Sequence, residues 1–424
     1  MKRAFCQNCQ THVSVSSDFG SNPKHMLYYC NECDTELSFK FCILAAGKGT
    51  RNNDVKGLHK ALLPLENRPI ISHIIDKLDS KIEIVIAVGY KSEQIKSYLD
   101  EVYSNRKITY VDVDNYDKQG SGPGYSLLCC RSELQKPFIF TSVDTIVEED
   151  VAFNYISENW LGVSEVDLDA SMQYCLVRGD KYLDKLFYGT GNRAFVGMAG
   201  INDYEDFWES LENHKTIKDE HQVIHGFDNL ETIRLIDFTW HDTGNNKAYY
   251  DTKKIFNKEI VANKKDEAIF LHKGKVVKYF DNPKRAKTRI KRAKYLNGNA
   301  PEVKLINEHM YSYDFIDGQL LSDITNEKVL NKFLDFCQNK LWEDIDWDKL
   351  YKNAKPSSFH GDLQPENILY NQSDDKFILI DWREGFGNNI EVGDVYYDLS
   401  KLYHALLING NSVLKRMYDY QVNM

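Results

Sequence analysis

Short apolar runs alternate with amphipathic stretches over the first large part of the chain. An apolar run at 41–46 leads into a glycine-rich loop, and 92–99 and 204–211 carry apolar residues at helical spacing. Strand and helix patterns that alternate in this way are typical of βαβ units and a mostly parallel sheet. We therefore predict an α/β fold here. Further strands are predicted at 82–88, 108–113, 137–142 and 232–238.

The pattern changes near residue 265. Two short strands are predicted at 268–272 and 275–280, joined at Lys273-Gly274 like a hairpin, and a basic stretch follows at 284–294. Helical spacing dominates after Asn326. This change predicts a separate domain, and a cluster of cysteines near the N-terminus predicts a small third one. The predicted domains are 1–38, 39–262 and 263–424.

The composition is that of an ordinary globular protein, with 42% of the 424 residues hydrophobic and 27% charged. The 53 Lys and Arg against 63 Asp and Glu give a net charge of −10, which argues against nucleic acid as a partner. The sequence has no apolar run of about 18 residues that would predict a membrane span, and no N-terminal apolar segment typical of a secretory signal. Nine cysteines, several within apolar runs, favour a reducing cytoplasm over a disulfide framework.

Two Cys-x2-Cys pairs lie in the N-terminal part, Cys6 with Cys9 and Cys30 with Cys33. Two such turns can complete a tetrahedral shell of four thiolates, which suits Zn2+. Because protein would fill all four positions, the predicted role of the metal is structural. Two disulfides, four unrelated thiols or bound iron are the alternatives. The segment resembles a zinc ribbon, and its balanced charge favours docking on a protein surface.

A glycine-rich loop, Leu44-Ala-Ala-Gly-Lys-Gly-Thr-Arg51, follows the first strand of 39–262. Small residues let backbone N–H groups approach phosphate oxygens, and Lys48, Arg51 and Lys60 add positive charge where a triphosphate would lie. A plain glycine turn with surface basic residues is the alternative. The loop resembles that of the nucleotidyltransferase superfamily, which joins NTPs to sugar phosphates or phosphocholine. Lys60-Ala-Leu-Leu-Pro-Leu65 resembles the second segment of that superfamily.

This resemblance implies a Rossmann-like nucleotidyltransferase domain with a mixed sheet, in which Arg51 and Lys60 act on the phosphates of the nucleotide. It also implies that Asp144 and Asp242 hold one Mg2+, which would offset the repulsion between two reacting phosphate groups. Taken singly, either aspartate is more often a turn or cap residue. A later loop, from Gly120, is interpreted as a base-binding loop or a plain connection. The implied nucleotide-binding residues are Leu44, Ala45, Ala46, Gly47, Lys48, Gly49, Thr50, Gly120, Gly122, Tyr125 and Ser126.

The most specific string is His360-Gly-Asp-Leu-Gln-Pro-Glu-Asn367, followed by Ile378-Leu-Ile-Asp-Trp382. It resembles the catalytic loop and the metal-binding segment of the aminoglycoside phosphotransferase/choline kinase family. The resemblance implies an α+β protein-kinase-like domain in which Asp362 accepts the proton of an alcohol. Asn367 and Asp381 would bind the Mg2+ that bridges the ATP phosphates. Asp398 is expected to anchor the helix that supports the loop.

The kinase-like part also departs from this family. Lys278 is the best candidate for the nucleotide-binding lysine, but its usual acidic partner on the next helix is missing, because 284–294 contains no acid. We interpret that basic stretch as a solvated helix face, with binding of a phosphate or a partner as the alternative. No glycine-rich loop precedes Lys278. Relatives carry more helices after the segment of Asp398, so this domain is expected to be truncated.

Together, the motifs predict a bifunctional enzyme. The kinase-like domain would phosphorylate a small alcohol (a sugar, polyol or amino alcohol) with ATP. The transferase domain would couple that phosphate to an NTP, giving pyrophosphate and an NDP-activated precursor for surface polysaccharides. CTP is the first choice by analogy with cytidylyltransferases. One alternative treats the kinase-like domain as an inactive binding module, and another treats the whole chain as a regulatory or scaffold protein. Assembly into an oligomer is left open.

Overall fold

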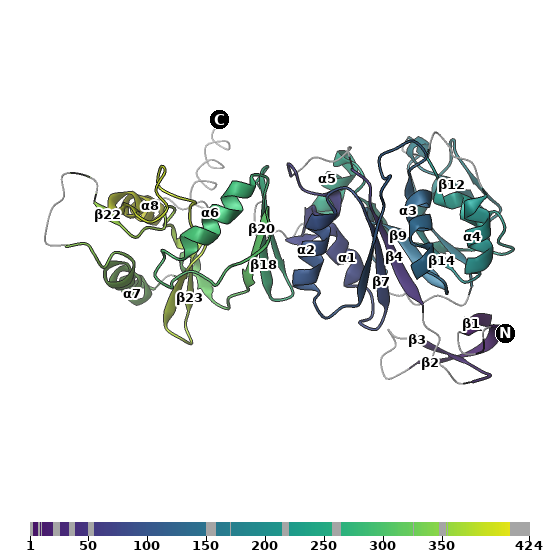
Figure 1. Cartoon of the computed structure of the whole chain (residues 1–424), viewed down its shortest axis with the longest axis horizontal. Helices are drawn as coiled ribbons and strands as arrows, with labels where there is room; N and C mark the ends of the chain where they lie inside the picture. Colours follow the sequence, from purple (N-terminus) through teal and green to yellow (C-terminus); the bar gives the residue numbers. More distant parts are fainter. Residues whose placement is uncertain are drawn as a thin grey trace, which may run out of the picture. The chain divides into compact units, whose positions relative to one another are not determined.

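The structure, a computed structural model, divides into two compact units, Met1–Lys265 and Asp266–Met424 (Figure 1). Near the N-terminus, β1 (Arg3–Cys6), β2 (Thr11–Phe19) and β3 (Met26–Cys30) form an antiparallel sheet. None of the described helices is long and apolar enough to cross a membrane. The described residues are 3–6, 9, 11–19, 26–33, 39–49, 55–149, 158–169, 171–213, 220–256, 264–324, 326–346, 353 and 355–407.

Within its described residues, the first unit is built on a mixed sheet of nine strands. The central strand β4 (Lys40–Ala45) runs parallel to β7 (Glu83–Val88) on one side and to β9 (Phe138–Ser142) on the other. β8 (Ile108–Asp112) continues the parallel part, whereas β14 (Arg193–Ile201) lies antiparallel to β9. This arrangement confirms the predicted α/β class with a mixed sheet. The sheet is extended by β11 (Trp160–Glu165), β12 (Leu176–Arg178), β13 (Lys185–Phe187) and β15 (Arg234–Asp237).

The central strands are apolar on both faces because both faces are covered. Phe41 to Ala45 are buried, as expected for parallel strands between two layers. α3 (Pro123–Cys129) packs on β4 and β7, and α4 (Tyr204–Glu212) packs beside α3. The core on this side is rich in aromatic rings, with Phe138 stacked on Trp208 at 5.1 Å. Among the described residues, the other α-helices of the unit are α1 (Ile70–Ile75), α2 (Ser92–Val102) and α5 (Asn246–Ile255).

The second unit begins with an antiparallel sheet in the order β17-β18-β20-β19, covered by α6. Val276, Phe280 and Tyr311 lie on one face of the sheet and build a small core between sheet and helix. These elements are β17 (Glu267–His272), β18 (Lys275–Phe280), α6 (Pro283–Ala293), β19 (Lys304–Asn307) and β20 (Met310–Asp314).

A second core in this unit lies among helices and short strands around Phe333, Leu363 and Trp382. The hairpin of β23 and β24 carries the two segments that resemble a kinase, because one precedes β23 and the other follows β24. The elements are β21 (Gln319–Leu320), α7 (Glu327–Phe336), β22 (Pro356–Ser357), β23 (Ile368–Asn371), β24 (Lys376–Leu379), β25 (Gly393–Asp394) and α8 (Val395–Leu407).

Candidate active sites

Two aspartates of the first unit meet beside Gly244. Asp144 lies in the turn between β9 and β10 (Thr145–Val147), and Asp242 ends β16 (Trp240–Asp242). These short strands pair antiparallel, with Thr145 opposite Asp242. A Cβ atom on Gly244 would stand 3.1 Å from Asp242 Oδ1 and 3.2 Å from Asp144 Oδ2. The two carboxylates therefore face one small gap, which glycine keeps open.

Lys60 supplies positive charge at this gap. Its Nζ lies 2.8 Å from Asp144 Oδ2, while Ser142 Oγ donates a hydrogen bond to Asp144 Oδ1. Burial alone would raise the pKa of Asp144, but the Lys60 ammonium and these hydrogen bonds lower it to about 2. Asp144 is therefore ionised at neutral pH, as a metal ligand must be.

Asp242 is held by three neighbours. Tyr174 Oη donates to Asp242 Oδ2 at 3.0 Å, and the Gly244 amide donates to Oδ1 at 2.7 Å. Thr252 Oγ1 donates to the backbone oxygen of Asp242 at 2.9 Å. Tyr174 is itself packed edge-on against Trp240, with 5.1 Å between the ring centroids. The sequence did not predict Tyr174, because nothing in its own segment points to Asp242.

The glycine-rich loop leaves the carboxyl end of β4 and passes close to Lys60. Gly49 has a φ of +61°, and a Cβ atom there would stand 2.8 Å from Lys60 Cδ. Glycine is required at this position both by the left-handed backbone and by the contact. Thr50 and Arg51 lie outside the described residues, so their roles stay predictions. The residues that lead into the loop are buried: Leu44, Ala45 and Ala46.

His59 ties this loop to Lys60. The Ala61 amide donates to His59 Nδ1 at 3.0 Å, so Nε2 carries the ring hydrogen and donates to Gly47 O at 3.3 Å. Burial and the neighbouring Lys60 charge lower the pKa of His59 to about 3, which keeps the ring neutral near pH 7. His59 is not among the site residues predicted from the sequence, although it directly precedes Lys60.

The second glycine-rich loop leads into α3. Gly120 and Gly122 have φ values of +84° and +146°, and Tyr125 and Ser126 follow within the helix. This loop contacts the first one, because Asp117 Oδ2 lies 2.8 Å from Lys48 Nζ. Both loops thus follow the carboxyl ends of parallel strands of one sheet, β4 and β8, with β7 between them. Ligands bind at such strand ends in open α/β sheets.

The oxygen ligands of the first unit fit Mg2+. In the described part of the chain, no group of three or more His, Cys, Asp or Glu side chains is arranged to hold a metal. Mg2+ does not need such a cage, since it binds through one or two carboxylates and completes its shell with phosphates and water. The side chains of Cys6 and Cys30 lie outside the described residues, so the zinc site with Cys9 and Cys33 stays a prediction.

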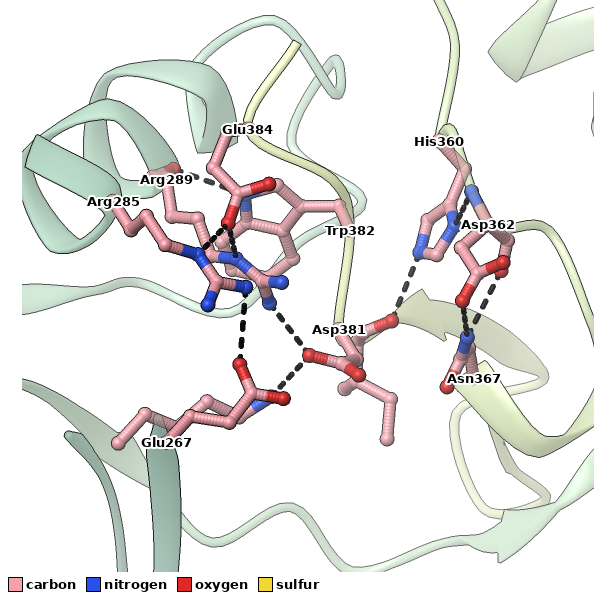
Figure 2. Close-up of polar contacts among 11 residues, drawn as sticks. Glu267, Arg285, Arg289, His360, Asp362, Asn367, Asp381, Trp382 and Glu384 are labelled. Carbon is pink, nitrogen blue, oxygen red and sulfur yellow. Dashed lines mark hydrogen bonds and ion pairs between the residues drawn. The ribbon is translucent and has the colours of Figure 1, made fainter. Parts of the chain in front are cut away.

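In the second unit, His360 fixes the loop that carries Asp362. The Asp362 amide donates to His360 Nδ1 at 3.2 Å, and His360 Nε2 lies 2.9 Å from Ile380 O. Burial lowers the pKa of His360 to about 4, so this ring is also neutral near pH 7. Asn367 Nδ2 donates to Asp362 O at 2.9 Å and lies 3.3 Å from its Oδ2 (Figure 2). Two predicted site residues, Asp362 and Asn367, are thus in direct contact.

Asp381 stands between this loop and the arginines of α6 (Figure 2). Its Oδ1 accepts hydrogen bonds from Lys278 Nζ at 2.9 Å and Arg289 Nη1 at 2.6 Å. Burial alone would raise the pKa of Asp381, but these two cations hold it far below its usual range. Because the Ile380 amide also donates to Asn367 O at 2.9 Å, the segment of Asp381 is joined to the loop of Asp362. The structure therefore brings Lys278, Asp381 and Asn367 to one site.

Helix α8 supports the same loop. Asp398 is buried, and its carboxylate accepts hydrogen bonds from the amides of His360 at 2.6 Å and Gly361 at 2.7 Å. This confirms the anchoring role predicted for Asp398. Burial raises the pKa of Asp398 to about 6 against the opposing effect of these amides. From the same helix, Lys401 Nζ lies 3.1 Å from Asp362 Oδ1.

The basic stretch at 284–294 is not simply a solvated helix face, and that interpretation is corrected here. Lys284, Lys287, Lys291 and Lys294 are exposed, but the arginines face the protein interior. Arg285 and Arg289 both bind Glu384, and Arg292 donates to the backbone oxygen of Phe359. The arginines at 285, 289 and 292 follow helical spacing, so they share one face of α6.

Two family models match the chain. Residues 41–162 match the MobA-like NTP transferase domain, and residues 308–417 match the phosphotransferase enzyme family. Both resemblances drawn from the sequence motifs are thereby confirmed. The matches overlie the two sites, since the first includes Lys60 and Asp144 and the second includes Asp362 and Asp381.

Curated relatives resemble part of the first unit. Bifunctional protein GlmU of Methanococcus vannielii is 32% identical over 127 residues, which are 30% of this chain and 29% of the relative. UTP--glucose-1-phosphate uridylyltransferase AglF of Haloferax volcanii is 32% identical over 107 residues, which are 24% of this chain and 42% of the relative. The chain thus spans less than half the length of these relatives. A solved structure of UDP-glucose pyrophosphorylase complexed with UDP-glucose has a TM-score of 0.46 and 19% identity, covering 52% of this chain and 99% of that one.

Proposed function

Since the chain carries a MobA-like NTP transferase domain and a phosphotransferase-family domain, we propose that it catalyses two consecutive reactions. ATP phosphorylates a small alcohol in the second unit, and the first unit couples the resulting phosphate to an NTP with release of pyrophosphate. One observation carries the proposal. Each unit places a lysine on an ionised carboxylate beside further oxygen ligands, with Lys60 on Asp144 and Lys278 on Asp381.

In the phosphorylation step, Asp362 accepts the proton of the alcohol while the alcohol oxygen attacks the γ-phosphorus of ATP and ADP leaves. Gln364 Nε2 lies 3.0 Å from Asp362 Oδ1, and Asn367 contacts Oδ2, so the carboxylate is held from both sides. Lys278 offsets phosphate charge. Asp381 and Asn367 would hold Mg2+, which supplies further positive charge to the triphosphate when bound.

In the coupling step, a phosphate oxygen of the acceptor attacks the α-phosphorus of the NTP, and pyrophosphate leaves. Two anions must approach each other, so the site has to supply cations. Lys60 lies at the gap between Asp144 and Asp242, and Lys48 lies on the glycine-rich loop that follows β4. Asp144 and Asp242 would hold the Mg2+ that adds to this positive charge. Both carboxylates are oriented by neighbouring donors before substrate arrives.

The finer features of the reaction belong to the same proposal. We propose CTP as the first nucleotide to test, from the resemblance of the glycine-rich loop to that of cytidylyltransferases. The product would be an activated precursor for surface polysaccharide synthesis. A reducing, cytoplasmic setting is supported by the thiols that form no disulfide: Cys42, Cys129, Cys130, Cys175 and Cys337.

The experiment uses the purified full chain with Mg2+ and measures two products. ADP is followed with ATP and a panel of sugars, polyols and amino alcohols, and pyrophosphate is followed with each NTP and the matching phosphates. We expect pyrophosphate with one phosphate and one preferred NTP. Absence of pyrophosphate with every pair would contradict the transferase activity.

A second candidate keeps the transferase activity but treats the second unit as a binding module without catalysis. The observation in its favour is that Asp381 Oδ1 is already engaged by two cations, Lys278 and Arg289. ADP formation that Asp362→Ala abolishes would exclude this candidate. Nucleotide binding without ADP formation from any alcohol tested would support it.

The N-terminal cysteines are proposed to bind one structural Zn2+. The observation behind this is the spacing of the two pairs, Cys6 with Cys9 and Cys30 with Cys33. We expect one zinc per chain by elemental analysis. A Cys9→Ser/Cys33→Ser variant should lose the zinc, and zinc retained at the wild-type level would contradict the assignment.

A further inference from the structure

Helix α6 turns a buried arginine toward the metal-binding segment of the second unit. Arg289 is 5% exposed, and its guanidinium donates from Nη1 to Asp381 at 2.6 Å and from Nε to Glu384 at 3.1 Å. The Trp382 indole donates to the backbone oxygen of Arg289 at 2.9 Å. Both ends of this residue are therefore fixed by the segment that follows β24 (Figure 2).

The carboxylate of Asp381 is engaged asymmetrically. Within the described part of the chain, the hydrogen bonds from Lys278 and Arg289 both reach Oδ1. Asp381 also has a φ of +57°, a backbone conformation that few residues other than glycine adopt. The orientation of its carboxylate is set by these two hydrogen bonds. Arg289 and Lys278 provide that orientation and leave Oδ2 for another ligand.

Glu384 makes this arrangement rigid. Its Oε1 accepts from Arg289 Nε and from Arg285 Nε at 2.7 Å, and Arg285 Nη2 also reaches Glu267 at 3.1 Å. The planar guanidinium of Arg289 thus bridges two carboxylates with its fork of donors. A lysine could carry the same charge but could not reproduce this geometry.

We propose that Arg289 is a positioning residue for divalent cation binding in the second unit, an inference that rests on the proposed kinase function. Held by Glu384, Arg289 fixes Asp381 so that Oδ1 accepts from the two cations and Oδ2 would be left to hold a divalent cation. Helix α6 contains no acidic residue, and its contribution to the site is the cation Arg289, which acts through Asp381. Removing an outer partner of a metal ligand typically weakens metal affinity about 10–100-fold.

The test measures Mn2+ binding to the full chain by electron paramagnetic resonance, in the presence of a non-hydrolysable ATP analogue. Every protein carries Asp144→Asn, which is expected to remove the cation site of the first unit. In this background, Asp381→Asn should abolish Mn2+ binding. Arg289→Gln should weaken it about 10–100-fold while the affinity for the metal-free analogue changes less than about twofold. Lys287→Gln, on the exposed face of the same helix, is the matched control and should bind Mn2+ like the background protein.

Two milder variants keep the proposal testable where Arg289→Gln fails to fold. Arg289→Lys keeps the charge but loses the fork, and Glu384→Gln loosens Arg289 without touching Asp381. Each should weaken Mn2+ binding several-fold. Unchanged Mn2+ affinity in these variants, with binding lost in Asp381→Asn, would overturn the positioning role alone. A background protein that takes up no Mn2+ with the analogue would overturn the proposed kinase function as well.

Discussion

The two candidate sites use similar parts with different charge balance. In the first unit, Lys60 is the described cation on Asp144, and a second carboxylate, Asp242, faces the same gap. In the second unit, Asp381 is paired with both Lys278 and Arg289. Acids exceed bases in the first site, whereas the carboxylate of the second site is already neutralised. The stability of the first unit should therefore depend strongly on Lys60, whereas the stability of the second unit should tolerate the loss of one of its two cations.

The loops of the two sites are fixed by the same device. His59 accepts from the amide of Ala61, two residues further on, and pairs with Gly47 O through its other nitrogen. His360 does the same with the amide of Asp362 and with Ile380 O. Both rings are buried and neutral, so each joins two backbone segments without adding charge to the candidate site. The two sites thus differ in the balance of their charged side chains, but in both a buried neutral histidine fixes the backbone.

The largest effect is expected from substitutions that remove one of the two activities and leave the other. Asp144→Asn should lower pyrophosphate formation on the order of 10³-fold, because the loss of one preorganised charge contact costs about 10²–10³. The same variant should leave ADP formation from the alcohol unchanged, since Asp144 lies in the other unit. Asp362→Asn should give the reverse result. Measuring both products for both variants checks the assignment, and loss of both activities in either variant would contradict two independent sites.

The second effect is a loss of folding stability at acidic pH, caused by the two buried neutral histidines. Burial lowers the pKa of His59 to about 3 and of His360 to about 4, below the value near 6.5 expected in the unfolded chain. Below pH 6.5 these histidines become protonated in the unfolded chain but stay neutral in the folded chain. The free energy of unfolding therefore decreases as the pH falls from 7. At pH 5 each histidine should cost roughly 2 kcal/mol. Urea unfolding at pH 7.5 and pH 5 measures the net change, which in the second unit is partly offset by Asp398, because its pKa of about 6 lets the folded chain bind a proton in the same range.

Substitution identifies the histidine responsible. His59→Gln should reduce the acid-induced loss for the first unit only, and His360→Gln should reduce it for the second unit only. His404 is exposed on α8, so His404→Gln is the control and should leave the difference between the two pH values unchanged. An acid-induced loss that is the same in all four proteins would show that other groups cause it.

Much of the first unit could be predicted because its strands are buried on both faces. The predicted strands at 82–88 and 137–142 each contain an unbroken apolar run, at 84–88 and 137–140, and they form β7 and β9 within a residue of the predicted bounds. The sites could be predicted where a residue stands in a local motif. Asp362 and Asn367 share one loop, and their contact follows from that loop.

The remainder depends on contacts between distant segments. Tyr174 reaches Asp242 only because β16 brings Trp240 and Asp242 beside it, and no local pattern encodes this. The arginines of α6 had a signal that was overlooked. Along 284–294 the arginines at 285, 289 and 292 share one helix face and the lysines share another, and a planar guanidinium is the group suited to buried carboxylates.

The third effect tests the charge balance itself. Lys60→Gln leaves Asp144 facing Asp242 without a described cation, and should destabilise the first unit by about 1–2 kcal/mol. Lys278→Gln leaves Arg289 on Asp381, and should cost the second unit less than about 1 kcal/mol. Denaturant unfolding followed separately for the two units measures both. Adding Arg289→Gln to Lys278→Gln should then cost more than the two single changes together, because the last cation on Asp381 is removed.

The smallest effect comes from the glycine-rich loop and shows how closely that loop and Lys60 depend on each other. Gly49→Ala places a methyl group on a backbone with a φ of +61° and against the Lys60 side chain, so it should destabilise the first unit by about 1 kcal/mol. Gly47→Ala is the matched control for stability, because nothing stands within 4 Å of its added methyl group. If Gly49→Ala displaces Lys60 from Asp144, combining it with Lys60→Gln should cost less than the sum of the single changes. Full additivity would mean that the loop and the Lys60–Asp144 pair are independent. The first site would then resemble the second, where Asp381 is held by more than one cation.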